Sequence, residues 1–374
     1  MNDLSSSIDA PGDPPIVWII TGYRAGEDTQ ILALAEALQW PFSTKRLVYQ
    51  AYDFIPGLLR LASLKGINLA RSSPLVPPWP DLVISAGMRN EPVCRWIKAQ
   101  SGGRTRIVLL GRHWARLEHF DLVITTPQYR LPQDTKILHN ITTLHRVNEN
   151  MLREARTRHA ATLAGLPRPH IAVVMGGSSG PYTLGRRAAR RLARQACAMA
   201  RAQGGALLVT SSSRTPAAAI DAFSAAAACP MRFYRWKPAD KANPYYAYLA
   251  SADAIIVTGD SIAMLSEACA TGKPVYIFDL GTGREAMRPQ PAGSRHARGG
   301  AERNDFRLGA LLYRLLMRHG PQRLTRDIRL VHSQLTASGL TTWLDETCTP
   351  PSPGQPPPDS IERAVARVRS MLGR

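Results

Sequence analysis

Short apolar runs alternate with helical segments along most of the chain, and this alternation constrains the fold more than any other feature. Bounded by turn signals, the runs lie at residues 16–21, 82–86, 107–110, 122–125, 171–175, 207–210, 232–234, 254–258 and 275–278. Strands that are separated by helices pair in parallel, and helices cover their sheet. The sequence therefore predicts two Rossmann-like α/β domains with parallel sheets.

The domain boundary is expected where the rhythm pauses. A helical stretch at 148–164 leads into GLPRPH, a Gly- and Pro-punctuated segment suited to a linker, so we expect the boundary near Pro167. The predicted organisation is a disordered leader at 1–14, a first domain at 15–166, a second domain at 167–348, and a Pro-rich tether with a final helix at 349–374. At 374 residues the chain is long enough for each domain to bury its own core.

The chain carries a strong excess of positive charge. Its net charge is +19, and a field of that sign attracts phosphates in nucleotides, anionic lipids or nucleic acid. Zinc-finger spacing and RNA-binding sheet motifs are absent from the sequence, so nucleic acid is not an expected partner. The segment RRAARRLARQ at 186–195 is either a solvated helix face or a contact to an anionic membrane surface.

The expected location of the protein follows from the lack of long apolar segments in the sequence. No apolar run is long enough to cross a bilayer, and the N-terminal residues lack the apolar core of an export signal. We therefore expect a cytoplasmic protein that associates with the inner face of the cytoplasmic membrane peripherally, through charge.

The cysteines form no zinc or redox motif and are expected to be buried free thiols: Cys94, Cys197, Cys229, Cys269 and Cys348.

Three motifs follow predicted strands of the second domain. In IAVVMGGSSGPYTLG, a Gly/Ser loop after Met175 offers backbone amides for a phosphate, although a tight turn without ligand has the same signature. VTSSSRTP adds hydroxyls and the Arg214 cation. VTGDSIAMLSEA adds Asp260 or Ser261 as a helix cap, and Glu267 as either an exposed carboxylate or a ribose acceptor. Ligands of open parallel sheets bind beyond the carboxyl ends of the strands, so we expect these loops to face one crevice.

The first domain presents candidate acid–base groups at the same kind of edge. In TGYRAGEDTQ, either Glu27 or Asp28 can act as a general base, and either is also favourable at a helix start for electrostatic reasons alone. The loop SAGMRNEP is expected to point Arg89 and Glu91 into the crevice. GRHW carries His113, which is either catalytic or a satisfied structural histidine.

Taken together, these motifs resemble the bacterial branch of the elongated-mitochondria, or mitochondrial fission, family, whose members are described as glycosyltransferases. The resemblance runs from about residue 16 to residue 278 and includes NPYYAYLASAD. It implies the glycosyltransferase-B architecture, in which the sheets of two domains face a central cleft and a C-terminal helix crosses back to the first domain. In that architecture the first domain binds the acceptor and the second binds the nucleotide sugar.

The resemblance also implies roles for individual residues. Gly177 and Ser178 would contact phosphates, Ser213 and Arg214 the diphosphate, Ser261 and Met264 the nucleotide's edge, and Glu267 the ribose, with Gly176 and Asp260 in the same nucleotide-binding set. Asp28, Glu27 and His113 are the catalytic candidates. The opening loop departs from the Asp-Gly-Lys-type start of relatives, and Gly259 stands where relatives often carry an acidic residue.

The function expected from these features is metal-independent transfer of a sugar from a nucleotide-diphosphate donor. The sequence has no Asp-x-Asp pair, so arginine and helix dipoles would replace a bound cation, and no cofactor beyond the donor substrate is expected. The acceptor would be a lipid-linked or polysaccharide intermediate at the cytoplasmic membrane face. The alternatives are a nucleotide-sugar epimerase and a non-catalytic, membrane-associated interaction protein of the mitochondrial-fission type.

Overall fold

The computed structural model describes residues 13–22, 24–51, 55, 59, 61–289, 304–345 and 359–374. Most of the predicted leader and nearly all of the predicted Pro-rich tether lie outside the described residues. The chain divides into two compact units. The first contains the described residues of Met1–Ile124, Gln133–Leu138 and Ile361–Arg374, and the second contains those of Thr125–Pro132 and His139–Ser360.

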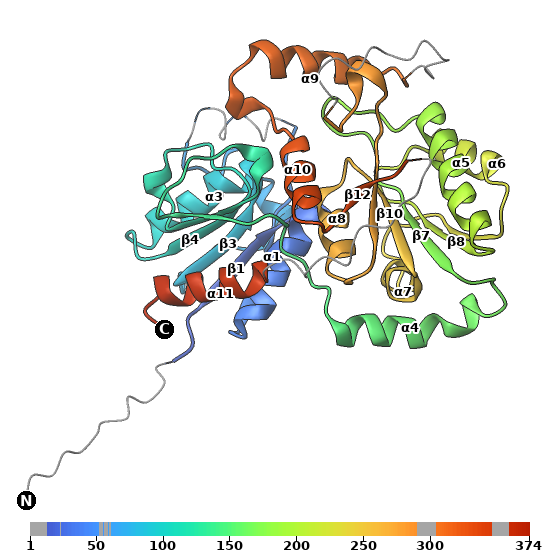
Figure 1. The fold of residues 1–374 in the computed structure, drawn as a ribbon. Coiled ribbons are helices and arrows are strands. Elements are labelled where there is room, and N and C mark those ends of the chain that lie inside the picture. The colour runs from blue at the N-terminus through green and yellow to red at the C-terminus, as the bar shows by residue number, and fades with distance from the viewer. Residues whose placement is uncertain are drawn as a thin grey trace, which may run out of the picture. The chain divides into compact units, whose positions relative to one another are not determined.

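A six-stranded parallel sheet forms the centre of the first unit (Figure 1), in the order β2-β1-β3-β4-β5-β6. Its strands are β1 (Val17–Thr21), β2 (Phe42–Arg46), β3 (Leu82–Ala86), β4 (Arg106–Leu110), β5 (Leu122–Thr125) and β6 (Ile137–His139). Its helices include α1 (Ala25–Leu38), α3 (Gly87–Gln100), η1 (Leu69–Arg71) and η2 (Leu117–His119). Strands β1, β3 and β5 are buried along their whole length because helices cover both faces of the sheet.

The second unit repeats this plan with strand order β12-β11-β10-β7-β8-β9. Its strands are β7 (His170–Val174), β8 (Ala206–Thr210), β9 (Met231–Tyr234), β10 (Ala254–Thr258), β11 (Val275–Phe278) and β12 (Thr342–Trp343). Its helices include α4 (Glu149–Leu163), α5 (Arg186–Ala202), α6 (Ala217–Ala226), α7 (Tyr245–Ser251), α8 (Ile262–Cys269), α9 (Leu308–His319), α10 (Arg329–Ala337), η3 (Pro127–Tyr129), η4 (Gly283–Glu285) and η5 (Gln322–Leu324). The prediction of two Rossmann-like domains with parallel sheets is confirmed.

The change from the first unit to the second lies near His139, earlier than the boundary expected at Pro167. The reason is the packing of α4. Its Arg156 Nη2 donates to the carbonyl of Ala250 at 2.7 Å, and its Leu163 packs with buried core residues of the second unit. Although α4 precedes the GLPRPH segment, its contacts therefore assign it to the second unit.

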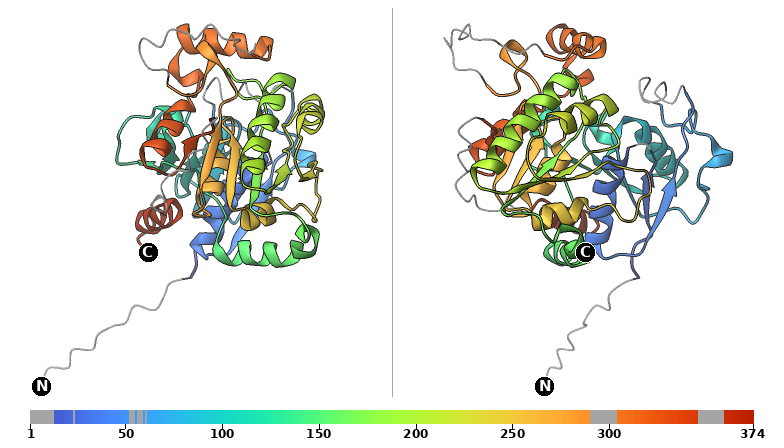
Figure 2. Two further views of the ribbon diagram at one scale, coloured as in Figure 1. Left: turned by 45° about the vertical axis from the view of Figure 1, so that its right-hand side comes forward. Right: turned by 90° about the vertical axis from the view of Figure 1, so that its right-hand side faces the viewer.

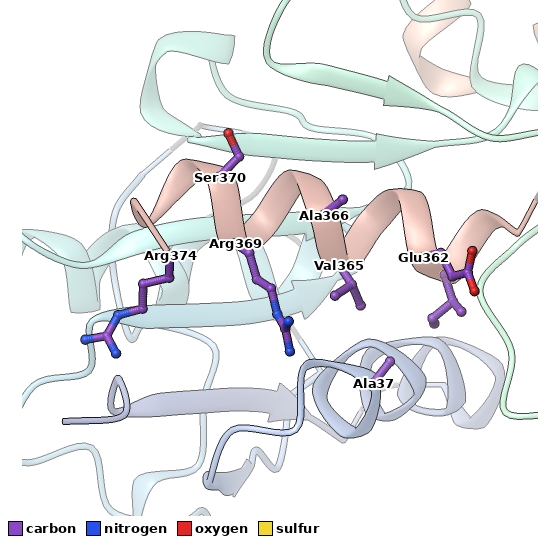
Figure 3. Close-up of a pocket in the computed structure, with 8 residues that line it drawn as sticks. Ala37, Glu362, Val365, Ala366, Arg369, Ser370 and Arg374 are labelled. Atoms are coloured by element: carbon purple, nitrogen blue, oxygen red, sulfur yellow. The ribbon is translucent and has the colours of Figure 1, made fainter. Parts of the chain in front are cut away.

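Helix α11 (Ser360–Met371) brings the chain back to the first unit. Its Ala364 and Val368 are fully buried, and Arg369 Nη2 donates to the carbonyl of Leu38 at the end of α1 at 3.2 Å. Figure 3 shows the Arg369 side chain pointing toward α1, the helix that carries Ala37. The predicted return of the final helix to the first domain, as in the glycosyltransferase-B architecture, is confirmed.

Two of the cysteines differ from the expectation of free thiols. Cys197 on α5 and Cys229 before β9 form a disulfide with their Cα atoms 5.5 Å apart, while Cys94 and Cys269 are free and buried as expected. Because the pair is separated by 32 residues, only the packing of the fold reveals that its members are neighbours. None of the described helices is both long and apolar enough to cross a membrane.

The packing of α11 predicts opposite outcomes for two similar substitutions. Ala364→Asp places a charge at a fully buried position and should lower the free energy of unfolding by about 3 kcal/mol or more. Ala366→Asp adds the same charge at an exposed position two residues away, so it should cost only about 1 kcal/mol, mostly through lower helix propensity. Urea denaturation of both variants checks this, and equal losses of stability would contradict the packing of α11 described above.

Candidate functional site

The site lies where the strand order of the second sheet reverses. From β7 the chain proceeds outward through β8 and β9, then returns to form β10 on the other side of β7. The carboxyl ends of β7 and β10 are therefore adjacent, while the loops that leave them run in opposite directions. Open α/β sheets bind ligands at such a reversal point.

The buried carboxylate of Asp260 joins the three loops at this point. It accepts the Gly177 amide at 2.8 Å, the Thr258 hydroxyl at 2.7 Å and the Arg214 Nη2 at 3.0 Å. Burial raises the pKa of Asp260, and the charge of Arg214 together with these hydrogen bonds opposes that rise. The loops after β7, β8 and β10 are thus held together by one side chain.

The two glycines of the MGG loop are needed for this close approach. A Cβ at Gly176 would lie 2.5 Å from both carboxylate oxygens of Asp260, and a Cβ at Gly177 would lie 2.4 Å from the Arg214 carbonyl. The Gly176 amide donates to Thr258 Oγ1 at 2.8 Å, so both glycine amides are engaged within the protein. Their neighbour Ser178 is half-buried, and its Oγ accepts the Leu184 amide at 3.1 Å.

The loop after β8 presents a cation to solvent. Ser212 Oγ donates to the Gly176 carbonyl at 2.9 Å and Thr215 Oγ1 to the Met175 carbonyl at 3.0 Å, which fixes this loop against the glycine loop. The Arg214 side chain between them is 44% exposed. Because Asp260 takes one of five guanidinium donors, the remaining donors are available to a phosphate group. Ser213 beside it is also exposed.

Helix α8 begins at the same edge without a side-chain cap. Ser261 occupies its N-cap position but makes no capping hydrogen bond, and the Asp260 carboxylate is directed to the glycine loop instead. The predicted capping role of these two residues is therefore not observed. The first amides of α8 therefore have no side-chain cap at the positive end of the helix dipole, and Met264 in this first turn is half-buried.

Glu267 lies deeper than expected. It is 8% exposed, and its carboxylate accepts hydrogen bonds from Tyr245 at 2.5 Å and Tyr246 at 3.4 Å. Burial raises the pKa of Glu267, and the two hydroxyls partly offset this. Both tyrosines belong to NPYYAYLASAD, a motif to which the sequence reasoning gave no site role. A ribose would therefore have to share these carboxylate oxygens with the tyrosine hydroxyls.

The first unit also has a strand-order reversal, between β1 and β3, and two catalytic candidates lie there. Asp28 accepts the Gly22 amide at 3.2 Å, and burial raises its pKa against the opposing effects of this bond and of Arg46. The Glu27 carboxylate lies against Gly87, where a Cβ would be 2.7 Å from Oε2. Asp28 thus has the raised pKa that suits a general base.

The other two first-domain candidates make structural contacts. His113 Nδ1 lies 2.8 Å from the carbonyl of Ala115 in its own turn. Glu91 is fully buried and accepts the amides of Trp114 at 2.6 Å and Ala115 at 2.7 Å, with Arg95 at 3.8 Å. The expectation that Glu91 points into a crevice is wrong because its carboxylate anchors the loop after β4. Within the described residues, no cluster of three or more His, Cys, Asp or Glu side chains is arranged to hold a metal ion.

Gly259 is explained by packing. A Cβ at this position would lie 2.7 Å from Met287 Sδ and 3.3 Å from His332 Cε1. His332 is almost fully buried on α10, and its Nε2 lies 2.7 Å from the Gly259 carbonyl. Burial lowers the pKa of His332 to about 4, so the imidazole stays neutral beside the site.

This histidine predicts a pH dependence of stability. Between its unfolded pKa of about 6.5 and its folded pKa of about 4, only the unfolded chain binds the proton, so His332 lowers stability as the pH falls. The loss attributable to it should reach at most about 3 kcal/mol. His332→Gln removes the titration and retains an amide donor for Gly259. The stability of the parent should fall more steeply than that of the variant between pH 7 and pH 4.5 in urea titrations, whereas parallel curves would exclude this effect.

The chain is similar to several proteins of known structure. Among solved structures, the chain is similar to Acinetobacter baumannii MurG (13% identity, TM-score 0.43, covering 96% of this chain and 92% of that one). It is also similar to an S. aureus MnaA–UDP co-structure (12% identity, TM-score 0.48, covering 96% and 97%).

Sequence comparison identifies two relatives. The Mitochondrial fission protein ELM1 of Arabidopsis thaliana is 28% identical over 239 residues, which are 58% of this chain and 55% of the relative, so the chain matches about half of that protein's length. An uncharacterized protein of Rickettsia prowazekii (strain Madrid E) is 25% identical over 298 residues, 70% of this chain and 82% of the relative. A family model described as Mitochondrial fission ELM1 matches residues 25–297, well over half of the sequence, and the chain therefore belongs to this family.

Proposed function

We propose that the second unit binds a nucleoside diphosphate sugar and that the protein transfers the sugar to an acceptor hydroxyl. The acceptor is a lipid-linked or polysaccharide intermediate made at the cytoplasmic face of the membrane. One observation carries the proposal: the half-exposed Arg214 guanidinium stands at the strand-order reversal, between a glycine loop and the uncapped start of α8. This arrangement gathers positive potential where an anionic ligand of an open α/β sheet is expected.

The proposed chemistry needs no metal. As the bond between sugar and diphosphate breaks, negative charge grows on the departing diphosphate, and Arg214, Ser213, Ser178 and the first amides of α8 would stabilise it. Asp260 neither binds the ligand nor titrates in this scheme. It holds Arg214 in place at 3.0 Å and balances part of its charge. Asp28, with its raised pKa, is our candidate for the base that accepts the proton of the acceptor hydroxyl.

Substitution of Arg214 tests the nucleotide site. Arg214→Ala removes a charge-assisted donor and should weaken binding of UDP, GDP or ADP, whichever the parent binds, by about 10- to 100-fold. Arg235→Ala, also in the second unit, removes an equally charged and exposed side chain paired with Asp221, so it controls for net charge. Isothermal titration well below the melting temperature separates affinity from stability. If the parent binds none of these nucleotides, or if Arg214→Ala binds them as the parent does, the proposed site is wrong.

Because Asp260 is buried, Arg214→Ala also leaves its carboxylate without a counter-charge. The variant Arg214→Ala/Asp260→Asn removes both charges and should recover much of the lost stability while remaining defective in nucleotide binding. This combination distinguishes a role in binding from a role in folding. Recovery of both properties together would assign Arg214 to structure alone.

Substitutions of Glu267 and of its partner Tyr245 should change the nucleotide affinity in different ways. If the ribose hydroxyls bind the Glu267 carboxylate, Glu267→Gln should weaken nucleotide binding. Tyr245→Phe should leave the affinity unchanged or increase it, because it frees the oxygen that now accepts the Tyr245 hydroxyl. Titration of both variants with the nucleotide that the parent binds checks this. A loss of stability in Glu267→Gln at unchanged affinity would show that the carboxylate only anchors α7 to α8.

A second candidate function is suggested by the family description, which names mitochondrial fission rather than an enzyme. A non-catalytic interaction protein with this fold would keep the packed glycine loop but would not cleave a nucleotide sugar. Product analysis with a labelled nucleotide sugar separates the possibilities. A new glycoside with free nucleoside diphosphate supports the transferase, interconversion of nucleotide sugars supports an epimerase, and absence of turnover supports the interaction protein.

A further inference from the structure

Helix α9 carries an apolar stripe on its outer face. Leu308, Leu311, Leu312 and Leu315 are 61%, 43%, 57% and 51% exposed, and Phe306 just before the helix is 81% exposed. The leucines recur at the i, i+3, i+4, i+7 spacing that places side chains on one face of a helix. A contiguous exposed stripe of this kind is unusual for a folded protein and marks an interaction surface.

The opposite face of α9 is tied to the glycine loop of the candidate site. Arg314 Nη2 donates to the Pro181 carbonyl at 2.8 Å, and Arg307 Nη2, just before the helix, donates to the Gly180 carbonyl at 2.6 Å. The ring of Tyr313 also lies against Gly180. The inner face of α9 is therefore committed to the second unit, and Figure 1 shows the helix at the periphery of that unit. The stripe lies on the side turned away from the site.

Exposed cations border the stripe. Arg318 is exposed at the C-terminal end of α9, and the exposed Arg323 follows in η5. At the other end, Asp305 accepts the backbone amides of Gly185 and Ala188, which joins the start of α9 to the start of α5. The views in Figures 1 and 2 agree that these two helix ends lie close together.

The start of α5, which Asp305 joins to the start of α9, carries further charge. Arg186, Arg187 and Arg190 are exposed there. The acidic groups nearby are directed inward, since Asp305 binds the α5 amides and Glu285 pairs with Arg314. A leucine stripe flanked by arginines, with the carboxylates withdrawn, has the character of an interfacial membrane helix.

We infer that α9 docks on an anionic lipid surface, with its four leucines in the acyl boundary and the bordering arginines on the headgroups. This inference goes beyond the proposed glycosyl transfer and does not depend on it. Its consequence for the site is direct: the helix that contacts lipid on one face holds the glycine loop on the other. The donor loop would then lie one helix diameter, about 10 Å, from the membrane surface, where a lipid-linked acceptor resides.

Charge complementarity favours lipid over a second copy of the chain. A two-fold contact through α9 would oppose like charges, because arginines lie near both ends of the helix, Arg318 and Arg323 at one and Arg186 and Arg187 at the other. A stripe of four leucines also falls short of the roughly 1,200 Å² that a stable dimer buries. The inference also revises the purely electrostatic membrane association expected from the sequence, because the surface has an apolar part as well.

Vesicle flotation tests the inference. The full chain should bind vesicles containing 30% phosphatidylglycerol and should not bind pure phosphatidylcholine. Leu308→Ser/Leu312→Ser should reduce the partition coefficient by about tenfold or more, since two side chains no longer enter the acyl boundary. Leu69→Ser/Val76→Ser changes two equally exposed residues of the first unit, 60% and 57%, and should bind as the parent does.

Three outcomes would overturn the inference: no binding of the parent to anionic vesicles, equal binding of the parent and the α9 variant, or a parent dimer that the α9 variant disrupts. If the α9 variant does not fold, hydrogen exchange of the parent tests docking instead. Vesicles should slow amide exchange in α9. Unchanged exchange in α9 would contradict docking. Nucleotide titration of Leu308→Ser/Leu312→Ser keeps the two proposals distinguishable. Affinity should equal that of the parent whether or not the variant binds lipid.

Discussion

The Asp260 carboxylate is the interaction on which the second unit's site depends. It is buried, and it accepts hydrogen bonds from the loops after β7 and β8 as well as from Thr258 at the end of its own strand. A buried carboxylate without partners would be costly, so the Gly177 amide and the Arg214 guanidinium are needed for it to remain charged. In return, it fixes the cation at the strand-order reversal. The half-exposed Arg214 cation and the buried Asp260 anion thus depend on each other.

The buried strands could be predicted from the sequence because each is a short apolar run bounded by turn residues. The ranges 82–86, 122–125, 254–258 and 275–278 coincide with β3, β5, β10 and β11. The missed strands lack this signal. The β2 strand reads FSTKR at an edge of the sheet with several residues exposed, β6 has three residues, and β12 has two. Edge strands are not buried on both faces, so their composition does not distinguish them from loops.

The motifs of the site were visible in the sequence, but the direction of their side chains was not. Asp260 and Ser261 both satisfy the pattern of a helix cap, yet the carboxylate of Asp260 is drawn to the glycine loop across 83 residues. Glu91 was expected in a crevice, and Glu267 either on an exposed helix face or at a ribose. Both are buried because their hydrogen-bond donors come from other elements. Partners distant in sequence decide burial, and a local pattern does not contain them. The same reason accounts for the Cys197–Cys229 disulfide and for the position of α4.

The return of α11 to the first unit makes that unit discontinuous along the chain, whereas the second unit is almost continuous from His139 to Ser360. During synthesis the second unit can therefore pair β7 to β11 while α11 is still to be made. The first unit can pair β1 to β5 early, but the surface of α1 that α11 covers stays open until the last part of this sequence emerges. Domains usually mature in the order in which they are translated. Here the domain that begins first would be the last to close, and its exposed α1 surface would be a natural binding site for chaperones in the interval.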